Sequence, residues 1–502
     1  MKKIFTLMMA AAATLTAAAT DYNEKMVITV NGEASEQTAV VTVNNNGETY
    51  DLTLKNFILQ SEDGPMGVGN VEIKNMKPQM SGNSVILTTN ETVTITEGDD
   101  PTVPFWMATL LPPVPVELQG VIENGHVCAS IHIDLQDVMQ QIIDVTVGTG
   151  YQFSNQSFET WHTSSGNYEE PDTWHSFESA SGMLASLAGH HISRSDDAHS
   201  GKASARIFST SIFGIIANGT MTTGRMNAGS MVASDKANNA YTDMSNSDVD
   251  GNGDPFYTPL VTRPDSIVFW YKFKQGKVND SHPYASVSTV ITDGTYYQDP
   301  EDKEYTNVVA RANSSTVAPA DQWTRMSLPF SYTEANIDPR AIMVTISTNA
   351  DAGQGSNGDE MLVDDIELVY NARLSTLKIE GQEVTGFDPE QLEYKATVKN
   401  ELKDDDIEVT TDGHSTHVVK DIQQTDHGYL CTITTYNANM TKSYTYHVDV
   451  ESTMLTAVRT INGSTQAQAA YYTIDGRRAN TPAKGKVYIV RKADGTVTKV
   501  VR

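Results

Sequence analysis

Acidic residues in two distant segments of the chain, with a polar turn between them, offer oxygen atoms that a hard cation could bind. Glu159 ends residues 155–159, and Asp364 and Asp365 lie within residues 362–368. Ca²⁺ takes about six to eight oxygen ligands from carboxylates, carbonyls and water. The simpler interpretation is that the second segment forms an edge strand whose charges point into water. The residue types alone leave both interpretations open.

Two other stretches contain residue types that bind metals. Residues 248–254 have the Asp-x-Asp-x-Asn-Gly spacing that opens an EF-hand loop, but Pro259 occupies the twelfth position, where the bidentate Glu belongs. We therefore expect a plain surface loop there. His190, His191 and His199 could suggest zinc, yet their spacing is unlike that of a zinc protease and the stretch is typical of a loop.

Glycan recognition usually needs an exposed aromatic face flanked by polar groups that orient the sugar hydroxyls. Aromatic residues in polar, loop-like stretches are the candidates for such a contact, namely Trp161, Tyr168, Trp174, Tyr257 and Tyr296. Trp174 could instead be a buried anchor. Trp270 and Trp323 lie in strand-like runs, which predicts that they belong to the core.

Glycoside hydrolysis needs two carboxyl groups about 5 to 9.5 Å apart. With 63 acidic residues, the sequence singles out no such pair. Asp364 and Asp365 are adjacent, so on a regular strand they would point to opposite faces and make a poor catalytic pair. The chain also contains no Ser/His/Asp, Cys/His or His-Glu-x-x-His signature.

The first nineteen residues are typical of a secretory signal. Residues 1–4 are basic, residues 5–19 are apolar and residues 17–19 are small. We expect residues 1–19 to be removed and the protein to be exported to the periplasm, the cell surface or the medium. No later stretch is apolar enough to predict a transmembrane segment. The two cysteines, Cys128 and Cys431, lie in alternating runs and are predicted to be small buried side chains.

The formal net charge of −28 disfavours nucleic acid and anionic lipid as partners. Neutral glycans, cations and basic surfaces remain compatible with it. The apolar residues recur mostly with period two and are separated by Asn-Gly and Asp-Gly turns, which predicts an all-β protein. One short helix is predicted at residues 135–143.

The N-terminal region, residues 20–147, resembles the calycin-like, lipocalin-related β-barrels of secreted bacterial proteins. Residues 49–59, 68–75 and 125–134 contain the matching strand patterns. This resemblance implies a small barrel, whose interior either holds a ligand or is filled by side chains.

The central region, residues 148–371, resembles the putative carbohydrate metabolism domain, a galactose-binding-like jelly roll. The matching segments are residues 155–161, 198–202, 253–258, 263–272, 322–330 and 362–368. In such a jelly roll the first and last strands meet. The resemblance therefore implies a structural Ca²⁺ held by Glu159, Asp364 and Asp365, with backbone oxygens near Ser200 and Lys202.

The remaining two regions contain no residues that suggest chemistry. Residues 372–452 resemble a cadherin-like, immunoglobulin-type β-sandwich, on the patterns of residues 374–381 and 386–394. Residues 453–502 resemble a C-terminal sorting module of the type IX secretion route, on the patterns of residues 471–477, 484–490 and 496–502. The hydrophobic strand that usually leads into such a module is thin here, so the tail is either a working export signal or only a final β-hairpin. Such a tail implies surface-attachment machinery as a partner.

The combined prediction is an exported, modular, noncatalytic glycan-binding protein that binds an oligo- or polysaccharide through its jelly roll. Two alternatives remain. One is a glycoside hydrolase, and the other is a surface adhesion or scaffold protein without a sugar site.

Overall fold

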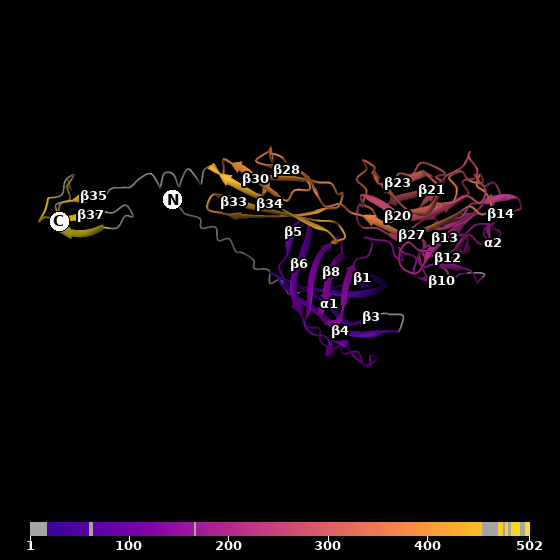
Figure 1. Cartoon of the computed structure of the whole chain (residues 1–502), viewed down its shortest axis with the longest axis horizontal. Coiled ribbons are helices and arrows are strands. Elements are labelled where there is room, and N and C mark those ends of the chain that lie inside the picture. The colour runs from indigo at the N-terminus through magenta and orange to yellow at the C-terminus, as the bar shows by residue number, and fades with distance from the viewer. Residues whose placement is uncertain are drawn as a thin grey trace, which may run out of the picture. The chain divides into compact units, whose positions relative to one another are not determined.

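The computed structural model describes residues 18–59, 64–164, 167–453, 470–474, 477–479, 483–491 and 497–501. Strands dominate these residues (Figure 1), which confirms the all-β prediction. No helix within the described ranges is long and apolar enough to cross a membrane. Most of the predicted signal, and parts of the predicted sorting tail, lie outside the described residues.

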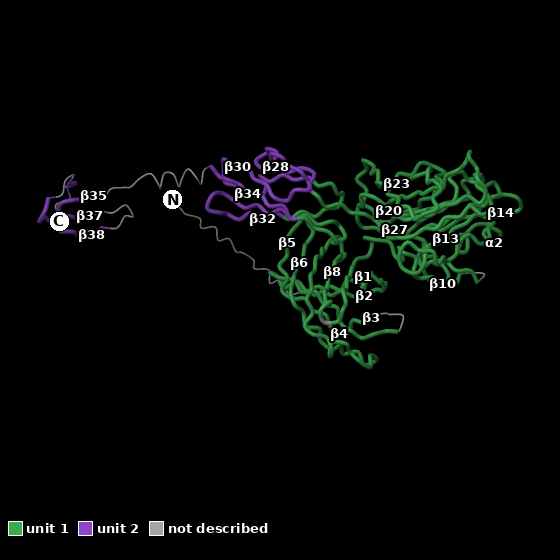
Figure 2. The backbone as a smooth tube through the Cα atoms, viewed as in Figure 1, with its two compact units in different colours: residues 1–373, 411–419, 435–444 green, residues 374–410, 420–434, 445–502 purple. Residues whose placement is uncertain are grey.

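The chain divides into two compact units (Figure 2), which are described separately. The first comprises residues 1–373, 411–419 and 435–444. The second comprises residues 374–410, 420–434 and 445–502.

The first unit begins with a nine-stranded antiparallel sheet in the order β4-β3-β2-β1-β9-β8-β7-β6-β5. Its strands are β1 (Ala18–Val30), β2 (Glu33–Asn45), β3 (Tyr50–Leu59), β4 (Met66–Met76), β5 (Gln79–Ser81), β6 (Ser84–Val93), β7 (Val114–Glu123), β8 (His126–Leu135) and β9 (Gln141–Val147). The sheet curls around a core that includes Met26, Leu52, Ile73 and Leu118, as expected of a calycin-like barrel.

The helix predicted at residues 135–143 is mostly wrong. Only α1 (Gln136–Met139) is helical, and the following residues form β9. Ile143 and Val145 alternate along β9 and pair with Ile133 and Ile131 of β8. Cross-strand pairing offers this short segment more burial than an isolated helix of nine residues, whose nucleation is costly.

The jelly roll follows, with two main sheets facing each other. One has the order β12-β13-β27-β20-β24, and the other contains β16-β26-β21-β23-β25 with β19 paired to β26. The elements of this region are β10 (Trp161–Thr163), β11 (Glu169–Pro171), η3 (Phe177–Ser179), α2 (Ala185–Ala188), β12 (Ile192–Ser195), β13 (Ser204–Phe208), β14 (Thr210–Ile212), β15 (Ile215–Ala217), β16 (Thr220–Thr222), β17 (Arg225–Ala228), β18 (Asn238–Thr242), β19 (Thr258–Pro259), β20 (Ser266–Lys274), β21 (Ala285–Thr292), β22 (Tyr297–Asp299), β23 (Val308–Val317), β24 (Ala320–Pro329), β25 (Ser331–Tyr332), β26 (Ala341–Ser347) and β27 (Glu360–Val369).

The core of the jelly roll lies between these two sheets. Ile207, Phe269 and Val363 from the first sheet pack with Val287 and Val344 from the second, and all five are almost fully buried. The pairing of β13 with the closing strand β27 places Ala205 opposite Val363. This register brings the turn that precedes β13 beside the acidic residues of β27.

The second unit contains most of a three-stranded sheet, β29-β28-β31, and of a four-stranded sheet, β30-β34-β33-β32, while the first unit includes one end each of β31, β32, β33 and β34. Their strands are β28 (Leu374–Ile379), β29 (Gln382–Glu383), β30 (Glu393–Val398), β31 (Ile407–Thr411), β32 (His417–Gln424), β33 (Gly428–Tyr436) and β34 (Ser443–Ser452). The C-terminal sheet contains β35 (Ala470–Tyr472), β36 (Arg478–Ala479), β37 (Val487–Arg491) and β38 (Val497–Val501). Cys128 and Cys431 are both buried free thiols, as predicted.

Candidate functional site

The turn at residues 199–203, which we call the closing turn, is held by the acidic residues of β27. Asp364 Oδ2 accepts hydrogen bonds from the backbone N–H of His199 at 2.7 Å and of Ser200 at 3.2 Å. The Ser200 hydroxyl donates to Asp365 Oδ1 at 2.7 Å, and His199 Nδ1 lies 2.6 Å from Asp365 Oδ2. Both adjacent carboxylates therefore contact the same turn.

The sequence predicted that Asp364 and Asp365 would point to opposite faces of a strand. A β-bulge explains why both side chains contact the closing turn instead. The register between β20 and β27 shifts between Val268 and Trp270, and Trp270 pairs with Asp364. Asp365 has a φ of 47°, in the left-handed region. A bulge interrupts the two-residue alternation and re-aims a side chain. A regular strand had been assumed, and that assumption was wrong.

Glu159 holds the other side of the closing turn. Its Oε1 accepts from the backbone N–H of Lys202 at 2.8 Å and of Ala203 at 3.2 Å. Gly201 lies between the anchored residues with a φ of 63°, and a Cβ built there would lie 2.1 Å from Glu159 Oε1. The turn thus needs glycine for its conformation and for its close approach to the carboxylate.

The electrostatics of the closing turn are dominated by Asp364, whose side chain is fully buried. Burial, followed by the nearby charge of Asp365, raises the pKa of Asp364 to about 7, while its amide hydrogen bonds oppose this shift. Its other oxygen, Oδ1, accepts from the backbone N–H of Asp365 at 2.8 Å. These hydrogen bonds account for closure of the turn without an ion, so calcium at Glu159, Asp364 and Asp365 stays a prediction.

Two tryptophans that were predicted to be core residues flank the closing turn instead. Trp270 and Trp323 are only partly buried. The His199 ring stacks on Trp270 with centroids 3.8 Å apart and planes 13° apart. Trp323 Nε1 donates to Asp197 Oδ1 at 3.2 Å. Trp270 alternates along β20 with the buried residues Phe269 and Tyr271, so it lies on the opposite face of that strand from the core.

The five aromatic residues predicted to bind glycan lie in different environments. Trp174 is fully buried between Phe153 and Phe158, so its ring is an anchor and offers no platform to a sugar. Trp161 and Tyr257 are partly buried. The remaining two, Tyr168 and Tyr296, are exposed. The Tyr168 ring stacks on that of His190, with centroids 4.1 Å apart.

Tyr296 borders a cavity of about 590 Å³ that we call the Tyr241–Tyr296 cavity. The rings of Tyr241 and Tyr296 lie 5.7 Å apart at 31°. The other lining residues are mostly polar, and they are Ser181, Asn227, Lys236, Ala237, Asn239, Gln298 and Asp302.

The strand register explains why these polar residues share one face. In the sheet β17-β18-β22, Asn227 pairs with Asn239, and Tyr241 pairs with Gln298. Side chains two positions apart on a strand lie on the same face, so Asn239 and Tyr241 point together. The opposite face contains Met226, Ala240 and Tyr297, which are buried in a separate apolar cluster.

One polar atom in the Tyr241–Tyr296 cavity is left without a partner. Asn239 Nδ2 donates to the carbonyl of Lys236 at 2.8 Å. Asn239 Oδ1 is buried and accepts no hydrogen bond from any residue that the structure describes. Gln298 is already engaged, because its Oε1 accepts from the Tyr296 hydroxyl at 2.9 Å. Asn239 therefore lines the cavity with one buried, unsatisfied acceptor.

Sequence reasoning found Tyr296 but missed Asn227, Asn239, Tyr241 and Gln298. The alternation of residues 238–242 was a readable signal for a strand with one polar face. The pairing of that strand with β22, more than fifty positions away, had no signal in the sequence.

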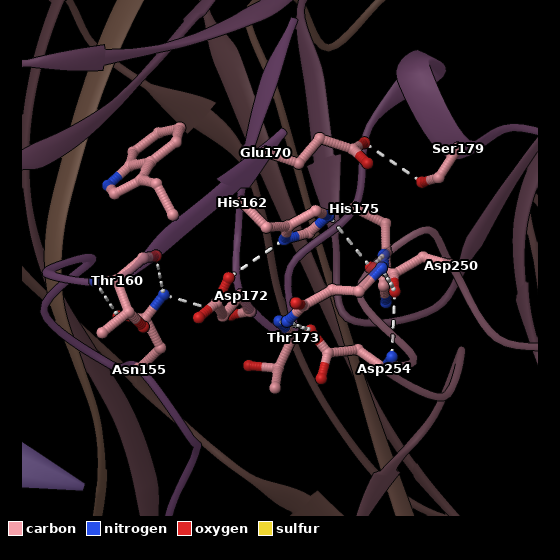
Figure 3. A network of polar contacts seen from close by, with 12 residues as sticks. Asn155, Thr160, His162, Glu170, Asp172, Thr173, His175, Ser179, Asp250 and Asp254 are labelled. Atoms are coloured by element: carbon pink, nitrogen blue, oxygen red, sulfur yellow. Dashed lines mark hydrogen bonds and ion pairs between the residues drawn. The ribbon is translucent and has the colours of Figure 1, made fainter. Parts of the chain in front are cut away.

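The acidic loop at residues 248–254 was expected to be a plain surface loop, but part of it is buried. Asp248 pairs with Arg225 at the surface, at 2.9 Å. The Asp250 side chain is fully buried beside His162 and His175 (Figure 3). Glu170 lies next to these residues, and burial is the main reason that its pKa rises to about 8. Burial lowers the pKa of His175 to about 4 despite the nearby charge of Asp250.

The histidines that suggested zinc have separate partners. His190 Nδ1 lies 2.6 Å from Glu178 Oε1. His191 is buried, and its Nε2 lies 2.6 Å from the carbonyl of Ala188. His199 belongs to the closing turn, so these three residues do not form a common site.

Comparisons with known proteins support the two resemblances that the sequence predicted. Residues 18–149 match the family model of a calycin-like β-barrel domain, and residues 145–369 match that of a putative carbohydrate metabolism domain. No curated protein matches the chain significantly.

Solved structures match with low scores. One described as a putative glycoside hydrolase from Bacteroides vulgatus has 19% identity and a TM-score of 0.32, and the match covers 44% of this chain and 98% of that one. Another of the same description, from Bacteroides thetaiotaomicron, has 15% identity and a TM-score of 0.34, and covers 59% and 92%. At such scores these two structures do not bear on the activity of this chain.

Proposed function

We propose that this chain, which carries a calycin-like β-barrel domain and a putative carbohydrate metabolism domain, is an exported, noncatalytic glycan-binding protein whose ligand occupies the Tyr241–Tyr296 cavity. The observation that carries this proposal is the pair of tyrosine rings, 5.7 Å apart, at a cavity whose other lining residues are mostly polar.

The aromatic rings account for binding energy. Tyr296 is 39% exposed and can offer one ring face to the apolar face of a sugar. Aromatic side chains bury about 150 to 250 Å² in full, so covering about a third of that area removes roughly 60 Å² from water. At about 25 cal/mol per Å² this contributes about 1.5 kcal/mol, or about tenfold in affinity.

The polar groups account for orientation. Sugar hydroxyls can form hydrogen bonds with the polar side chains that line the cavity, which include Asn227, Asn239 and Gln298. Lys236 and Asp302 line the same cavity and supply a donor and an acceptor of opposite charge.

The carboxyl groups favour binding over hydrolysis. Asp302 is the one carboxylate among the described residues that line the Tyr241–Tyr296 cavity. Glycoside hydrolases use a pair of carboxyl groups flanking the scissile bond. A hydrolase active site at this cavity would need a second acid from elsewhere in the chain.

A glycan array with the purified full chain tests the proposal, followed by calorimetry on any sugar that is retained. Tyr296→Ala should weaken Kd about tenfold. Tyr284→Ala is the matched control, because Tyr284 is similarly exposed, at 41%, and does not line this cavity.

Three outcomes would contradict the proposal. Retention of no sugar would favour the scaffold alternative. Release of reducing sugar would favour a hydrolase. Equal losses in Tyr296→Ala and Tyr284→Ala would place the ligand outside this cavity.

A further inference from the structure

The buried side chains of His162, Glu170, His175 and Asp250, which we call the His–acid cluster, come from four separate stretches of the jelly roll (Figure 3). His162 on β10 pairs directly with Glu170 on β11, so these two side chains lie on the same face of the small hairpin. The proposed glycan function uses none of the four.

The two histidines of the cluster each use one ring nitrogen to contact an acceptor outside it. His162 Nδ1 lies 3.0 Å from Asp172 Oδ1, and His175 Nε2 lies 3.4 Å from the carbonyl of Pro255. A carboxylate and a carbonyl can only accept, so these ring nitrogens carry the hydrogens. The other nitrogens, His162 Nε2 and His175 Nδ1, then present lone pairs to the centre of the cluster.

Each of the two acids in the cluster likewise uses one side-chain atom for a contact outside it. Asp250 Oδ1 accepts from the backbone N–H of Asn252 at 2.8 Å and of Asp254 at 2.9 Å. Glu170 Oε1 accepts from the backbone N–H of Ser176 at 2.7 Å. In each acid one oxygen is satisfied by the protein, and the second oxygen is left for the centre.

Inner atoms of His162, Glu170 and Asp250 converge on a small volume, and His175 Nδ1 lies beside Asp250. Asp250 Oδ2 lies 3.3 Å from His162 Nε2 and 3.5 Å from His175 Nδ1. One ligand atom each from His162, Glu170 and Asp250 lie within 4.8 Å of one another. Asp250 Oδ2, His162 Nε2, His175 Nδ1 and Glu170 Oε2 have no hydrogen-bond donor or acceptor in the described part of the chain.

Burial makes this convergence costly without a cation. The side chains of His175 and Asp250 are 0% exposed and that of His162 is 9% exposed. Lone pairs and carboxylate oxygens that face one another away from water repel, and each unsatisfied polar atom costs about 1 to 3 kcal/mol. A divalent cation between His162, Glu170 and Asp250 would satisfy one inner atom of each residue at once.

We propose that the His–acid cluster is a structural site for a divalent transition metal of the zinc class, with His162, Glu170 and Asp250 as ligands and His175 packed beside Asp250. Imidazole suits zinc and its neighbours and does not suit calcium or magnesium. Tetrahedral ligands about 2.1 Å from a metal lie about 3.4 Å from one another. The 3.3 Å between His162 Nε2 and Asp250 Oδ2 matches this value, and a ligand atom of Glu170 lies within 4.8 Å of both residues' ligand atoms.

The surrounding contacts also fit a metal site. Metal-binding histidines commonly donate their outer N–H to a carboxylate or a carbonyl, as His162 does here. The three ligands come from the β10–β11 hairpin and from the loop of Asp250, so a metal would hold this loop against the hairpin.

Metal content and spectroscopy of the full chain test the proposal. The protein is stripped with a chelator, dialysed and reloaded with Zn²⁺ or Co²⁺. We expect about one metal ion per chain by elemental analysis and the visible absorption of tetrahedral Co²⁺. Zinc in hundredfold excess over its Kd should raise Tm by about 5 to 10 °C.

Variants connect the metal to the cluster. His162→Ala and Asp250→Asn should abolish the Co²⁺ absorption, and Asp172→Asn should weaken metal affinity about 10- to 100-fold by releasing His162. His282→Ala is the matched control, because the partly exposed His282 also contacts an aspartate, Asp351, at 2.6 Å. It should keep full metal content.

Two results would overturn the proposal. One is a wild-type protein that retains no stoichiometric metal and whose Tm follows pH but not zinc, since a proton shared by His162 and Asp250 would then hold the cluster. The other is metal loss in His282→Ala equal to that in His162→Ala. The Co²⁺ spectrum of the wild type keeps the test decisive even if a variant fails to fold.

Discussion

Replacing Gly201 by Ala tests how the closing turn is held. The φ of 63° places this residue in the left-handed region, which costs an alanine about 1 kcal/mol. The new Cβ would lie 2.1 Å from Glu159 Oε1. Because the carboxylate ends a flexible side chain, it can move away, but only by losing the N–H donors of Lys202 and Ala203.

The magnitude follows from these contacts. Hydrogen bonds to a charged group are worth about 1.5 to 3 kcal/mol, and we take about 1 kcal/mol each because the turn is partly exposed. With the backbone cost, the free energy of unfolding should fall by about 3 kcal/mol. For a domain of this size each kcal/mol lowers Tm by about 2 to 4 °C, so we expect a loss of about 6 to 12 °C.

The assay is thermal and denaturant unfolding in the presence of a chelator, with tryptophan fluorescence as the signal that reports unfolding. Trp161, Trp174, Trp270 and Trp323 lie in the jelly roll, so four of the five tryptophans report on this domain. Gly214→Ala is the matched control, because Gly214 has a φ of 84° and open space around its Cβ position. It should show only the backbone cost of about 1 kcal/mol.

A double-mutant cycle gives the decisive result. In a Glu159→Ala background the clash and the two hydrogen bonds are both gone, so Gly201→Ala should cost only the backbone term. The coupling should therefore be about 2 kcal/mol. Equal costs in the two backgrounds, or a cost of Gly201→Ala no larger than that of Gly214→Ala, would refute the reasoning.

Three further predictions concern other parts of the jelly roll. If Asp365 holds calcium, Asp365→Ala should lower Tm more in calcium than in chelator, and equal losses would reject the metal. Burial raises the pKa of Asp299, so its contribution to stability is full below its unfolded pKa of about 3.9 and is lost as pH rises through the folded value. The unfolding midpoint of Asp299→Asn should accordingly decline less than that of the wild type between about pH 4 and pH 8, and parallel curves would contradict this. Trp174→Ala should cost about 3 to 5 kcal/mol in denaturant unfolding, and a cost as small as that of the partly exposed Trp323→Ala would show that the buried anchor is unimportant.

Much of the architecture could be predicted from the sequence because a half-buried strand repeats every two residues and a turn needs particular residues. The two-residue period of the apolar residues indicated strands. The segments ending at Glu159 and containing Asp364 were correctly placed near each other, since the backbone N–H of Ile366 donates to the carbonyl of Gln156 at 2.9 Å. That placement came from a resemblance to a known fold, because the local pattern of either segment is equally compatible with a solvated edge strand.

The errors have a common origin in features that have no local signal. The bulge at Asp365 reverses the direction expected for its side chain. Trp270 and Trp323 occupy strand positions, and only the facing sheet determines which side of a strand becomes the core. Asp250 is the third residue of a segment that opens like an EF-hand loop, yet the fold buries its side chain against two histidines.

The sequence by itself determined the strand content, the turns, the acidic charge and the order of the domains, since these depend on neighbouring residues and on composition. Tertiary structure alone decided which polar groups meet. Asn239 faces Tyr241 and Gln298, and His162 faces Asp250, because strand register and loop packing set those distances. Pairing register depends on the burial of whole faces summed over several strands, so it cannot be read from any one segment.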